Sequence, residues 1–333
     1  MRQCRLKKGA NGSVGKVRVG FGLCEMIRAP LAPSRWAWKP SIFTEMTMLS
    51  QKHNSINLGQ GFPDWNPPAY VVAAAQHSIS GAVSPLTNQY SRSAGMPRLC
   101  QALASHYSQR FGLKLDWQTN VAVTVGATEG IFASCMALLN PGDECIIIEP
   151  YYDSYPASVR MAGATPVCVP MTAPVGSRSS AAWKMDWSAL EAAASPRTRM
   201  IIVNSPHTPT GKLFDRDELN QLAAFAQKHN AYVLSDEVYE HITFDGVAPA
   251  RMAQLPGMWE RTLTLGSAGK TFSATGWKVR RCCVLNLHAL ASLSLLLSRS
   301  KPTTPLTHTH ATQSFDLPLR WAGRWDLRLY APQ

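Results

Sequence analysis

The stretch that decides the fold is RMIIVNSPHTPTGKLFDRDELNQLAAFAQKHNAYVLSDEVY, residues 199–239. Its first part, 199–206, is an apolar run that predicts a buried strand, and 217–230 predicts a helix. A second apolar run opens the segment 231–239 and predicts another strand. Two strands joined through a helix favour a parallel pair, because the helix carries the chain back to the starting edge of the sheet.

The same alternation continues in both directions from this stretch. Further apolar runs of strand length lie at 121–125, 144–150, 165–171 and in the first half of 261–270, and helices are predicted at 41–53 and 128–139. Short apolar strands separated by helices predict an α/β fold with a mostly parallel sheet and helices on both faces.

The charge distribution argues against a nucleic-acid partner, although the chain carries a net charge of +12. Nine Lys or Arg residues and one acid lie in 1–40, and seven Lys or Arg residues and two acids lie in 280–333. Subtracting these from the totals of 33 and 21 leaves 17 basic and 18 acidic residues in 41–279. A nucleic-acid-binding domain carries its basic residues on the folded part, so we predict no nucleic-acid partner.

These differences divide the chain into three parts. The composition of residues 1–40 predicts a basic, disordered N-terminal extension. The alternative is a mitochondrial presequence, because such segments are rich in Arg and poor in acids. We predict the α/β domain over residues 41–279 and a divergent, poorly ordered C-terminal tail over residues 280–333. We expect a cytoplasmic protein, with a mitochondrial location as the alternative.

Membrane attachment and metal binding are not predicted. Residues 282–297 are an apolar run of sixteen, which is short for a membrane span and contains Asn286 and His288. His308 and His310 have no carboxylate or thiol neighbour that would complete a metal site. The eight cysteines show no CxxC spacing, which indicates reduced, structural thiols.

Polar and aromatic residues follow five of the predicted strands. In a parallel sheet, ligands bind at the carboxyl ends of the strands. In chain order these ends carry Gly126, Ala127 and Thr128, then Tyr151 and Tyr152, then Asn204, then Asp236 and Tyr239, and finally Ser267 and Lys270. They combine a helix start, an aromatic face, an amide, a carboxylate with a phenol, and an amine. This set fits a flat, phosphorylated, electron-withdrawing cofactor.

Each residue type has a physical role in such a site. A helix start with small residues offers free N–H groups to a phosphate, and Tyr152 can stack on a ring. Asp236 can pair with a protonated pyridine nitrogen, which lets the ring absorb electrons. Tyr239 can hydrogen-bond a phenolic oxygen, and Lys270 can form an imine and act as general acid and base. Lys278 can add a second positive charge at the phosphate.

Taken singly, these residues carry little information. A lone Lys is usually a solvated surface charge, and a lone Asp at a strand end is usually a cap or turn residue. Their joint order, each at the same end of successive strands, is what favours a cofactor site.

Six segments resemble the class I/II aminotransferases, above all the kynurenine aminotransferases (glutamine transaminase K, cysteine-S-conjugate beta-lyase) and their methionine-aminotransferase-like relatives. They are INLGQGFPD (56–64), NQYSRSAGMPRL (88–99), VTVGATEGIF (123–132), IIIEPYYDSY (146–155), SDEVY (235–239) and GSAGKTFSATGWK (266–278). The last segment is the most specific. The resemblance covers 41–279 and implies PLP-dependent transferase fold type I, a homodimer, and pyridoxal 5'-phosphate (PLP) held by Lys270 as a Schiff base.

The resemblance also implies roles for individual residues. Lys270 is the expected catalytic residue. The expected cofactor-binding residues are Ala127, Thr128, Tyr152, Asn204, Asp236, Tyr239, Ser267 and Lys278, and Tyr90 would reach the phosphate of the partner subunit's cofactor. Gly61, Phe43 and Thr208 would border the substrate.

The sequence departs from the family pattern at two places. Relatives usually carry Asn where this chain has Thr208, and a Thr is shorter and offers one hydroxyl in place of an amide. After Val279, we find no likeness to the small domain of the family, which holds the Arg that clamps the substrate carboxylate. We therefore expect the small domain to be largely absent.

Two functions remain open from the sequence. The first is an enzyme that transfers the amine of an aromatic or sulfur amino acid, kynurenine among them, through Lys270 and PLP to a 2-oxo acid. The alternative is a truncated, catalytically impaired homologue that binds PLP at most.

Overall fold

The computed structural model describes residues 42–56, 65–277 and 280–285. The chain divides into two units, Met1–Leu293 and Ser294–Gln333, and every described residue lies in the first. The predicted sites at Gly61 and Lys278 lie outside the described residues, as do 1–41 and 286–333.

An eight-stranded sheet forms the centre of the described part, with strand order β1-β8-β7-β6-β5-β2-β3-β4. Its parallel strands are β2 (Glu144–Glu149), β3 (Thr165–Thr172), β5 (Thr198–Asn204), β6 (Tyr232–Asp236) and β7 (Thr262–Leu265). The antiparallel pairs join β3 to β4 (Lys184–Met185), and join β8 (Arg280–Leu285) to both β7 and β1 (Ala122–Thr124). The prediction of a mostly parallel sheet is confirmed.

Strand β8 corrects the boundary that was predicted at residue 279. Residues 280–285 pair with β1 on one side and with β7 on the other, so they belong to the sheet rather than to a tail. The apolar run that starts at Cys282 falls within the predicted C-terminal tail, and its first residues instead complete the sheet. Pairing between segments far apart in the chain leaves little trace in local sequence.

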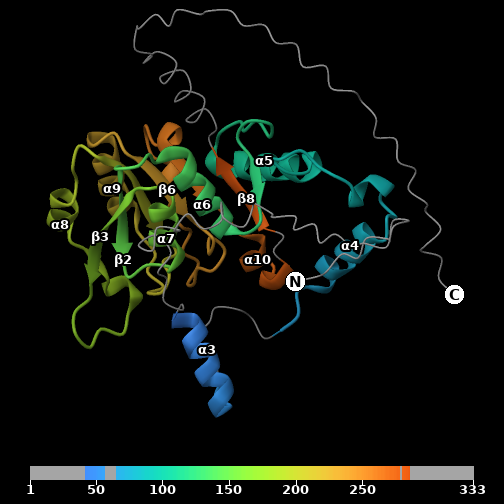
Figure 1. Cartoon of the computed structure of the whole chain (residues 1–333), viewed down its shortest axis with the longest axis horizontal. Coiled ribbons are helices and arrows are strands. Elements are labelled where there is room, and N and C mark those ends of the chain that lie inside the picture. The colour runs from blue at the N-terminus through green and yellow to red at the C-terminus, as the bar shows by residue number, and fades with distance from the viewer. Residues whose placement is uncertain (1–41, 57–64, 278–279, 286–333) are drawn as a thin grey trace, which may run out of the picture. The chain divides into compact units, whose positions relative to one another are not determined.

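Helices cover both faces of the sheet, as predicted (Figure 1). Alternate residues of a strand point to opposite faces, so Ile146 and Ile148 pack with α8 (Trp187–Ala192) and α9 (Arg216–Lys228). Cys145 and Ile147 instead pack with α6 (Ala127–Leu138) and α7 (Ser154–Met161). The other α-helices of the described residues are α3 (Ile42–His53), α4 (Ala69–Ile79), α5 (Pro97–Phe111) and α10 (Ala268–Thr271). Short 3-10 turns are η1 (Pro85–Asn88), η2 (Ser180–Ala182), η3 (Met252–Gln254), η4 (Trp259–Arg261) and η5 (Thr275–Trp277).

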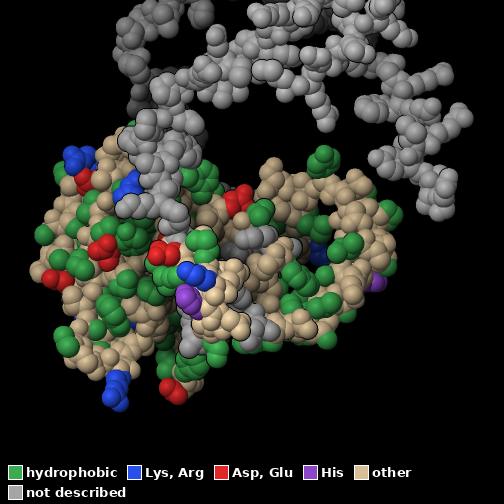
Figure 2. Space-filling view, turned by 60° about the horizontal axis from the view of Figure 1, so that its bottom comes forward, with side chains coloured by type: hydrophobic (Ala, Val, Ile, Leu, Met, Phe, Trp, Pro, Cys, Tyr) green, Lys and Arg blue, Asp and Glu red, His purple; other side chains and the backbone are tan. Residues whose placement is uncertain are grey.

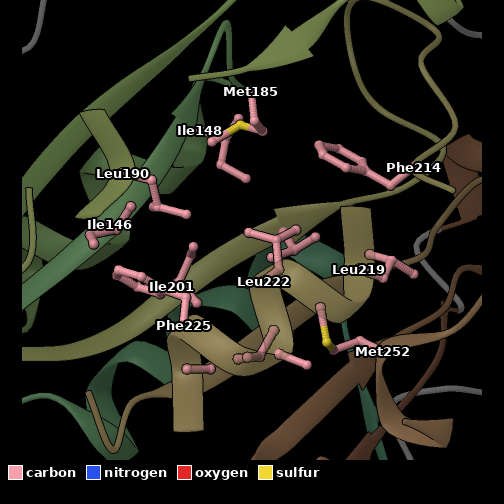
Figure 3. Packing of buried hydrophobic residues seen from close by; sticks show 14 of the residues in the cluster. Ile146, Ile148, Met185, Leu190, Ile201, Phe214, Leu219, Leu222, Phe225 and Met252 are labelled. Carbon is pink, nitrogen blue, oxygen red and sulfur yellow. The ribbon is translucent and has the colours of Figure 1, made fainter. Parts of the chain in front are cut away.

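Helix α9 shows how local sequence fixes an element. Its N-cap Asp215 accepts a hydrogen bond from the Glu218 backbone N–H at 2.8 Å, and the Glu218 carboxylate accepts one from the Asp215 N–H at 3.1 Å. This capping box satisfies two donors that the first helical turn leaves open. The helix then buries Leu219, Leu222 and Phe225 against the sheet (Figure 3).

Leu222 lies at the centre of this packing, with its side chain fully buried among the residues drawn in Figure 3. We expect Leu222→Ala to lower the free energy of unfolding by about 2–5 kcal/mol, because it removes buried methyl groups and leaves a cavity. Denaturant unfolding measures this loss. Leu49→Ala on the exposed helix α3 is the matched control, expected to change stability by less than about 0.5 kcal/mol. Equal losses in the two variants would contradict this assignment of the core.

Several large hydrophobic side chains lie outside the core. Helices α3 and α4 bury none of their residues. Among the described residues of this region (56 and 65–90), the most exposed large apolar side chains are those of Ile56, Trp65, Tyr70, Ile79, Leu86 and Tyr90. On the face drawn in Figure 2, hydrophobic side chains lie among charged ones that do not gather into a single patch. Within the described residues, no helix has the length and apolar character needed to cross a membrane.

Candidate active site

The carboxyl ends of β5, β6 and β7 meet at one edge of the sheet. Asn204, the last residue of β5, is paired with Asp236, the last residue of β6. Asp236 is in turn paired with Leu265, the last residue of β7. The segment Gly266–Lys270, which follows β7, therefore leaves the sheet at the same edge. This register brings together three of the five predicted strand ends.

Asp236 is a carboxylate held in the interior at this edge, with only 3% of its surface exposed. Its Oδ2 accepts a hydrogen bond from the Tyr155 hydroxyl at 2.6 Å, and its Oδ1 accepts one from the Val238 N–H at 3.2 Å. Burial raises the pKa of Asp236, while these donors and the positive charge of Lys270 act in the opposite direction. A buried carboxylate is costly to ionise without a cation nearby, so this position suits a positively charged group.

Lys270 lies on the short helix α10, which follows β7. Ser267 caps the helix, because its Oγ accepts a hydrogen bond from the Lys270 backbone N–H at 3.3 Å. The half-buried Lys270 side chain places its Nζ 5.2 Å from the centre of the Tyr239 ring. The Lys270 charge opposes the rise in the pKa of Asp236 that burial causes.

Asn204 is buried and binds backbone groups on two segments. Its Nδ2 donates to the Asp236 carbonyl at 2.8 Å and to the Pro206 carbonyl at 3.2 Å. Its Oδ1 accepts from the Thr208 N–H at 2.6 Å. The side-chain amide thus ties β5 to β6 and to the loop that carries Thr208. For Asn204 to donate to a cofactor, one of these two donated bonds would have to open.

The start of helix α6 supplies backbone N–H groups. Gly126 is its N-cap and has a φ of 92°, a conformation that favours glycine. Ala127, the first helical residue, is buried, and Thr128 is exposed. The N–H groups of a first helical turn have no partner within the helix, so they suit an anion.

The other predicted residues fall at different places. The half-buried Tyr152 has its ring centre 5.9 Å from that of Tyr155. Tyr90 is fully exposed, at 104% of its reference area, and Phe43 lies on α3. The roles of Tyr90, Phe43 and Thr208 stay predictions.

Tyr155 is a residue of the site that the sequence did not assign. The signal that could have found it is its position three residues after Tyr152, in the turn that opens α7, where the Tyr155 N–H donates to the Tyr152 carbonyl at 3.1 Å. The Tyr155 hydroxyl fixes the Asp236 carboxylate, and burial raises the pKa of Tyr155 well above its usual range. The phenol therefore stays a hydrogen-bond donor.

A buried ion cluster adjoins the site, and we define it as Tyr107, Glu237, Glu240 and Arg251. Arg251 donates from Nη1 to Glu237 at 2.5 Å and from Nη2 to Glu240 at 2.7 Å. The Tyr107 hydroxyl donates to Glu240 at 2.5 Å. Burial raises the pKa of Glu237 to about 7, with the Arg251 charge acting against this rise. For Glu240 burial is outweighed by the Tyr107 hydrogen bond and the Arg251 charge, which lower its pKa.

The raised pKa of Glu237 predicts a pH-dependent stability. The folded protein keeps a proton on Glu237 that the unfolded chain releases above its usual pKa of 4.5, so stability falls as pH rises from 4.5 to about 7. Across this pH window the free energy of unfolding should fall by about 3 kcal/mol, and Glu237→Gln should remove this fall. Denaturant unfolding of both proteins at about pH 5 and about pH 8 measures the difference.

Glu144→Gln provides the control for this measurement. Glu144 is also buried beside an arginine, but its hydrogen bond from the Ser195 hydroxyl lowers its pKa. Its contribution to stability is lost only as pH falls below 4.5, so this variant should leave the difference between about pH 5 and about pH 8 unchanged. An unchanged pH dependence in Glu237→Gln would contradict the charge assignment within the cluster.

The fold and the residues at the strand ends define a known class, the PLP-dependent transferases of fold type I. The chain belongs to the class I and II aminotransferase family, whose model matches residues 53–312. The resemblance inferred from the sequence is therefore confirmed.

Individual relatives are similar over most of this chain. It is 47% identical over 253 residues to the kynurenine–oxoglutarate transaminase of Dictyostelium discoideum, covering 73% of this chain and 58% of that protein. It is 44% identical over 241 residues to the human kynurenine–oxoglutarate transaminase 1, covering 71% and 57%. Among solved structures, the N-succinyldiaminopimelate aminotransferase of Mycobacterium tuberculosis matches with a TM-score of 0.69 and 40% identity, covering 80% and 67%. The chain thus spans a little over half the length of these two transaminases.

Proposed function

We propose that this protein is a PLP-dependent transaminase that transfers the amine of an aromatic or sulfur amino acid, kynurenine among them, to a 2-oxo acid. The observation that carries the proposal is that the Lys270 Nζ lies 5.2 Å from the centre of the Tyr239 ring, on the segment that follows Leu265, the strand partner of Asp236. The similarity to kynurenine–oxoglutarate transaminases supports the amino donor class. It does not support the alternative of a catalytically impaired homologue.

The residues present fit PLP at both of its ends. The buried Asp236, with its raised pKa, suits a cationic ring nitrogen, which would supply the charge that this carboxylate needs. The start of α6 with the small residues Gly126 and Ala127, together with the Ser267 hydroxyl, suits a phosphate. Bound PLP would supply an electron-withdrawing ring that stabilises negative charge at the substrate's α-carbon.

The chain's own groups then have separate roles. The Lys270 amine is the group that would bind the cofactor's aldehyde carbon and move a proton at the substrate. Asp236, oriented by the Tyr155 hydroxyl, would keep the ring nitrogen protonated. Tyr239 would donate to the ring oxygen, and Tyr152 would cover a ring face. Phe43, Gly61 and Thr208 would border the substrate.

A homodimer belongs to the proposal. Tyr90 is fully exposed and lies among other exposed apolar side chains between residues 56 and 90. A side chain that faces solvent in one copy is available to a second copy, and the proposed role of Tyr90 is to bind the phosphate in the partner subunit's site.

The decisive experiment separates cofactor binding from amine transfer. PLP is added to the purified, cofactor-free protein, and the visible absorbance band of lysine-bound PLP is recorded. Kynurenine should then remove this band and 2-oxoglutarate should restore it, with glutamate formed. A protein-free mixture of the same reagents is the control. Failure to form the band overturns the proposal, and a band that forms without glutamate production contradicts transamination.

Thr208 offers a test of the substrate side. We expect Thr208→Asn to tighten cofactor or substrate binding by up to about tenfold, because an amide adds a donor that the shorter hydroxyl lacks. The dissociation constant for PLP and the KM for kynurenine measure this gain. Thr165→Asn, at the exposed start of β3, is the matched control. Unchanged values in Thr208→Asn count against its place beside the ligand.

A further inference from the structure

The buried ion cluster links three separate segments of the chain. Tyr107 comes from α5, Glu237 and Glu240 follow β6 directly, and Arg251 precedes η3. All four side chains are buried. The Ser235 hydroxyl also donates to Glu237 at 2.9 Å, and the partly exposed Arg110 donates to Glu240 at 3.1 Å.

The cluster continues the segment that carries the candidate cofactor residues. Glu237 is adjacent to Asp236, and Glu240 is adjacent to Tyr239. The Glu237 backbone N–H also donates to the Leu265 carbonyl at 2.9 Å, which joins this segment to the end of β7. Two carboxylates of one turn, held by one buried arginine, thereby restrict how Asp236 and Tyr239 can move.

The same cluster touches the segment that carries Lys270. Gly266 lies so close to it that a Cβ at this position would stand 2.6 Å from the Tyr107 hydroxyl oxygen and 3.4 Å from a Glu240 carboxylate oxygen. The first distance is well inside van der Waals contact. The Tyr107 hydroxyl therefore packs directly against the backbone four residues before Lys270.

We propose that Tyr107, Glu237, Glu240 and Arg251 form a positioning network that holds the Asp236–Tyr239 segment and the Gly266–Lys270 segment in register for the cofactor. The inference rests on the proposed function. No member of the network is placed in contact with the cofactor. Its effect is exerted through the backbone on either side, at Glu237 and Glu240 for one segment and at Gly266 for the other.

A double-mutant cycle between Tyr107 and Gly266 tests the network. Tyr107→Phe keeps the ring, which stacks on Phe111, and removes the hydroxyl. It should raise the dissociation constant for PLP by about three- to tenfold through loss of the bond to Glu240. Gly266→Ala should raise it by about tenfold or more, because the new methyl group displaces the Tyr107 hydroxyl.

The double variant decides the matter. Without the hydroxyl, the methyl group of Ala at 266 has room, so the double variant should bind PLP within about threefold of Tyr107→Phe alone. A spectroscopic signature should follow the same order: the pH at which the visible band changes should shift in Gly266→Ala and return in the double variant. If the increases in the dissociation constant for PLP in the two single variants simply combine in the double variant, the proposal is overturned.

Two comparisons keep the outcome interpretable. Glu144→Gln removes a buried charge that contacts Arg197 at the opposite ends of the strands, and it should lower stability while leaving the dissociation constant for PLP unchanged. If Glu144→Gln weakens PLP binding as much as Tyr107→Phe does, the effect is general loss of stability and the proposal fails. If the unmodified protein forms no visible band with PLP, the proposed function itself fails.

Discussion

Replacing Lys270 with alanine is expected to abolish the visible absorbance band that PLP forms with this protein. The Lys270 Nζ is the amine that lies beside the Tyr239 ring and acts on the charge of Asp236. Without it, PLP can bind only through noncovalent contacts, and the proton at the substrate has no carrier. Amine transfer should therefore fall by at least about 10²–10⁴-fold. Absorbance titration and glutamate formation from kynurenine and 2-oxoglutarate measure the two effects.

A second lysine provides the control for this result. Lys228 lies in the last turn of α9, where its ammonium pairs with Glu191. Lys228→Ala should keep the visible band and the transfer rate, because an exposed ion pair contributes little to stability. A band that survives in Lys270→Ala but disappears in another lysine variant would mean that the covalent attachment lies elsewhere.

Asp236→Asn is expected to give a different pattern, in which the band still forms but requires more PLP. The amide keeps an oxygen to accept from the Tyr155 hydroxyl and removes the negative charge. The dissociation constant for PLP should rise by about 10–100-fold, since a charge-assisted hydrogen bond in a buried site becomes a neutral one. Amine transfer should slow further, because an unprotonated ring withdraws electrons less strongly.

Stability measured without cofactor shows whether Asp236→Asn acts as intended. Burial raises the pKa of Asp236 in the folded protein, so removal of the charge should not destabilise the cofactor-free state at neutral pH. Unfolding in denaturant, with and without PLP, separates the two states. A variant that is strongly destabilised without PLP would show that Asp236 serves the fold rather than the ligand.

Local pattern was sufficient to predict the central part of this molecule. Buried parallel strands are continuous apolar runs, so β2, β5, β6 and β7 stand out in the sequence, and the helix between β5 and β6 was predicted as well. Helices α7 and α8, between β2 and β5, were not predicted. Once the strands are taken as parallel, Asp236 and Lys270 must emerge at the same edge of the sheet. That step needs only topology, which is why these residues could be assigned.

Other features depend on contacts that no local pattern records. Arg251 lies in an irregular segment, and its partners become evident only when η3 packs against β7. In the sequence, Tyr107 cannot be told from an ordinary core aromatic of α5. Its hydroxyl donates a hydrogen bond to Glu240, which is 133 residues away. Strand β8 is antiparallel to its neighbours, so the alternation of strands and helices did not indicate it.

The position of β8 has a consequence for how the site is completed during synthesis. In the described sheet, β1 pairs with β8 and is separated by it from β7. The helix start at Gly126 and the amine at Lys270 are therefore joined through main-chain pairing only after residues 280–285 have left the ribosome. A nascent chain that ends before residue 280 would already contain every ligand-binding side chain assigned above. The helix start proposed to bind the phosphate would still lack β8, the strand that joins β1 to β7.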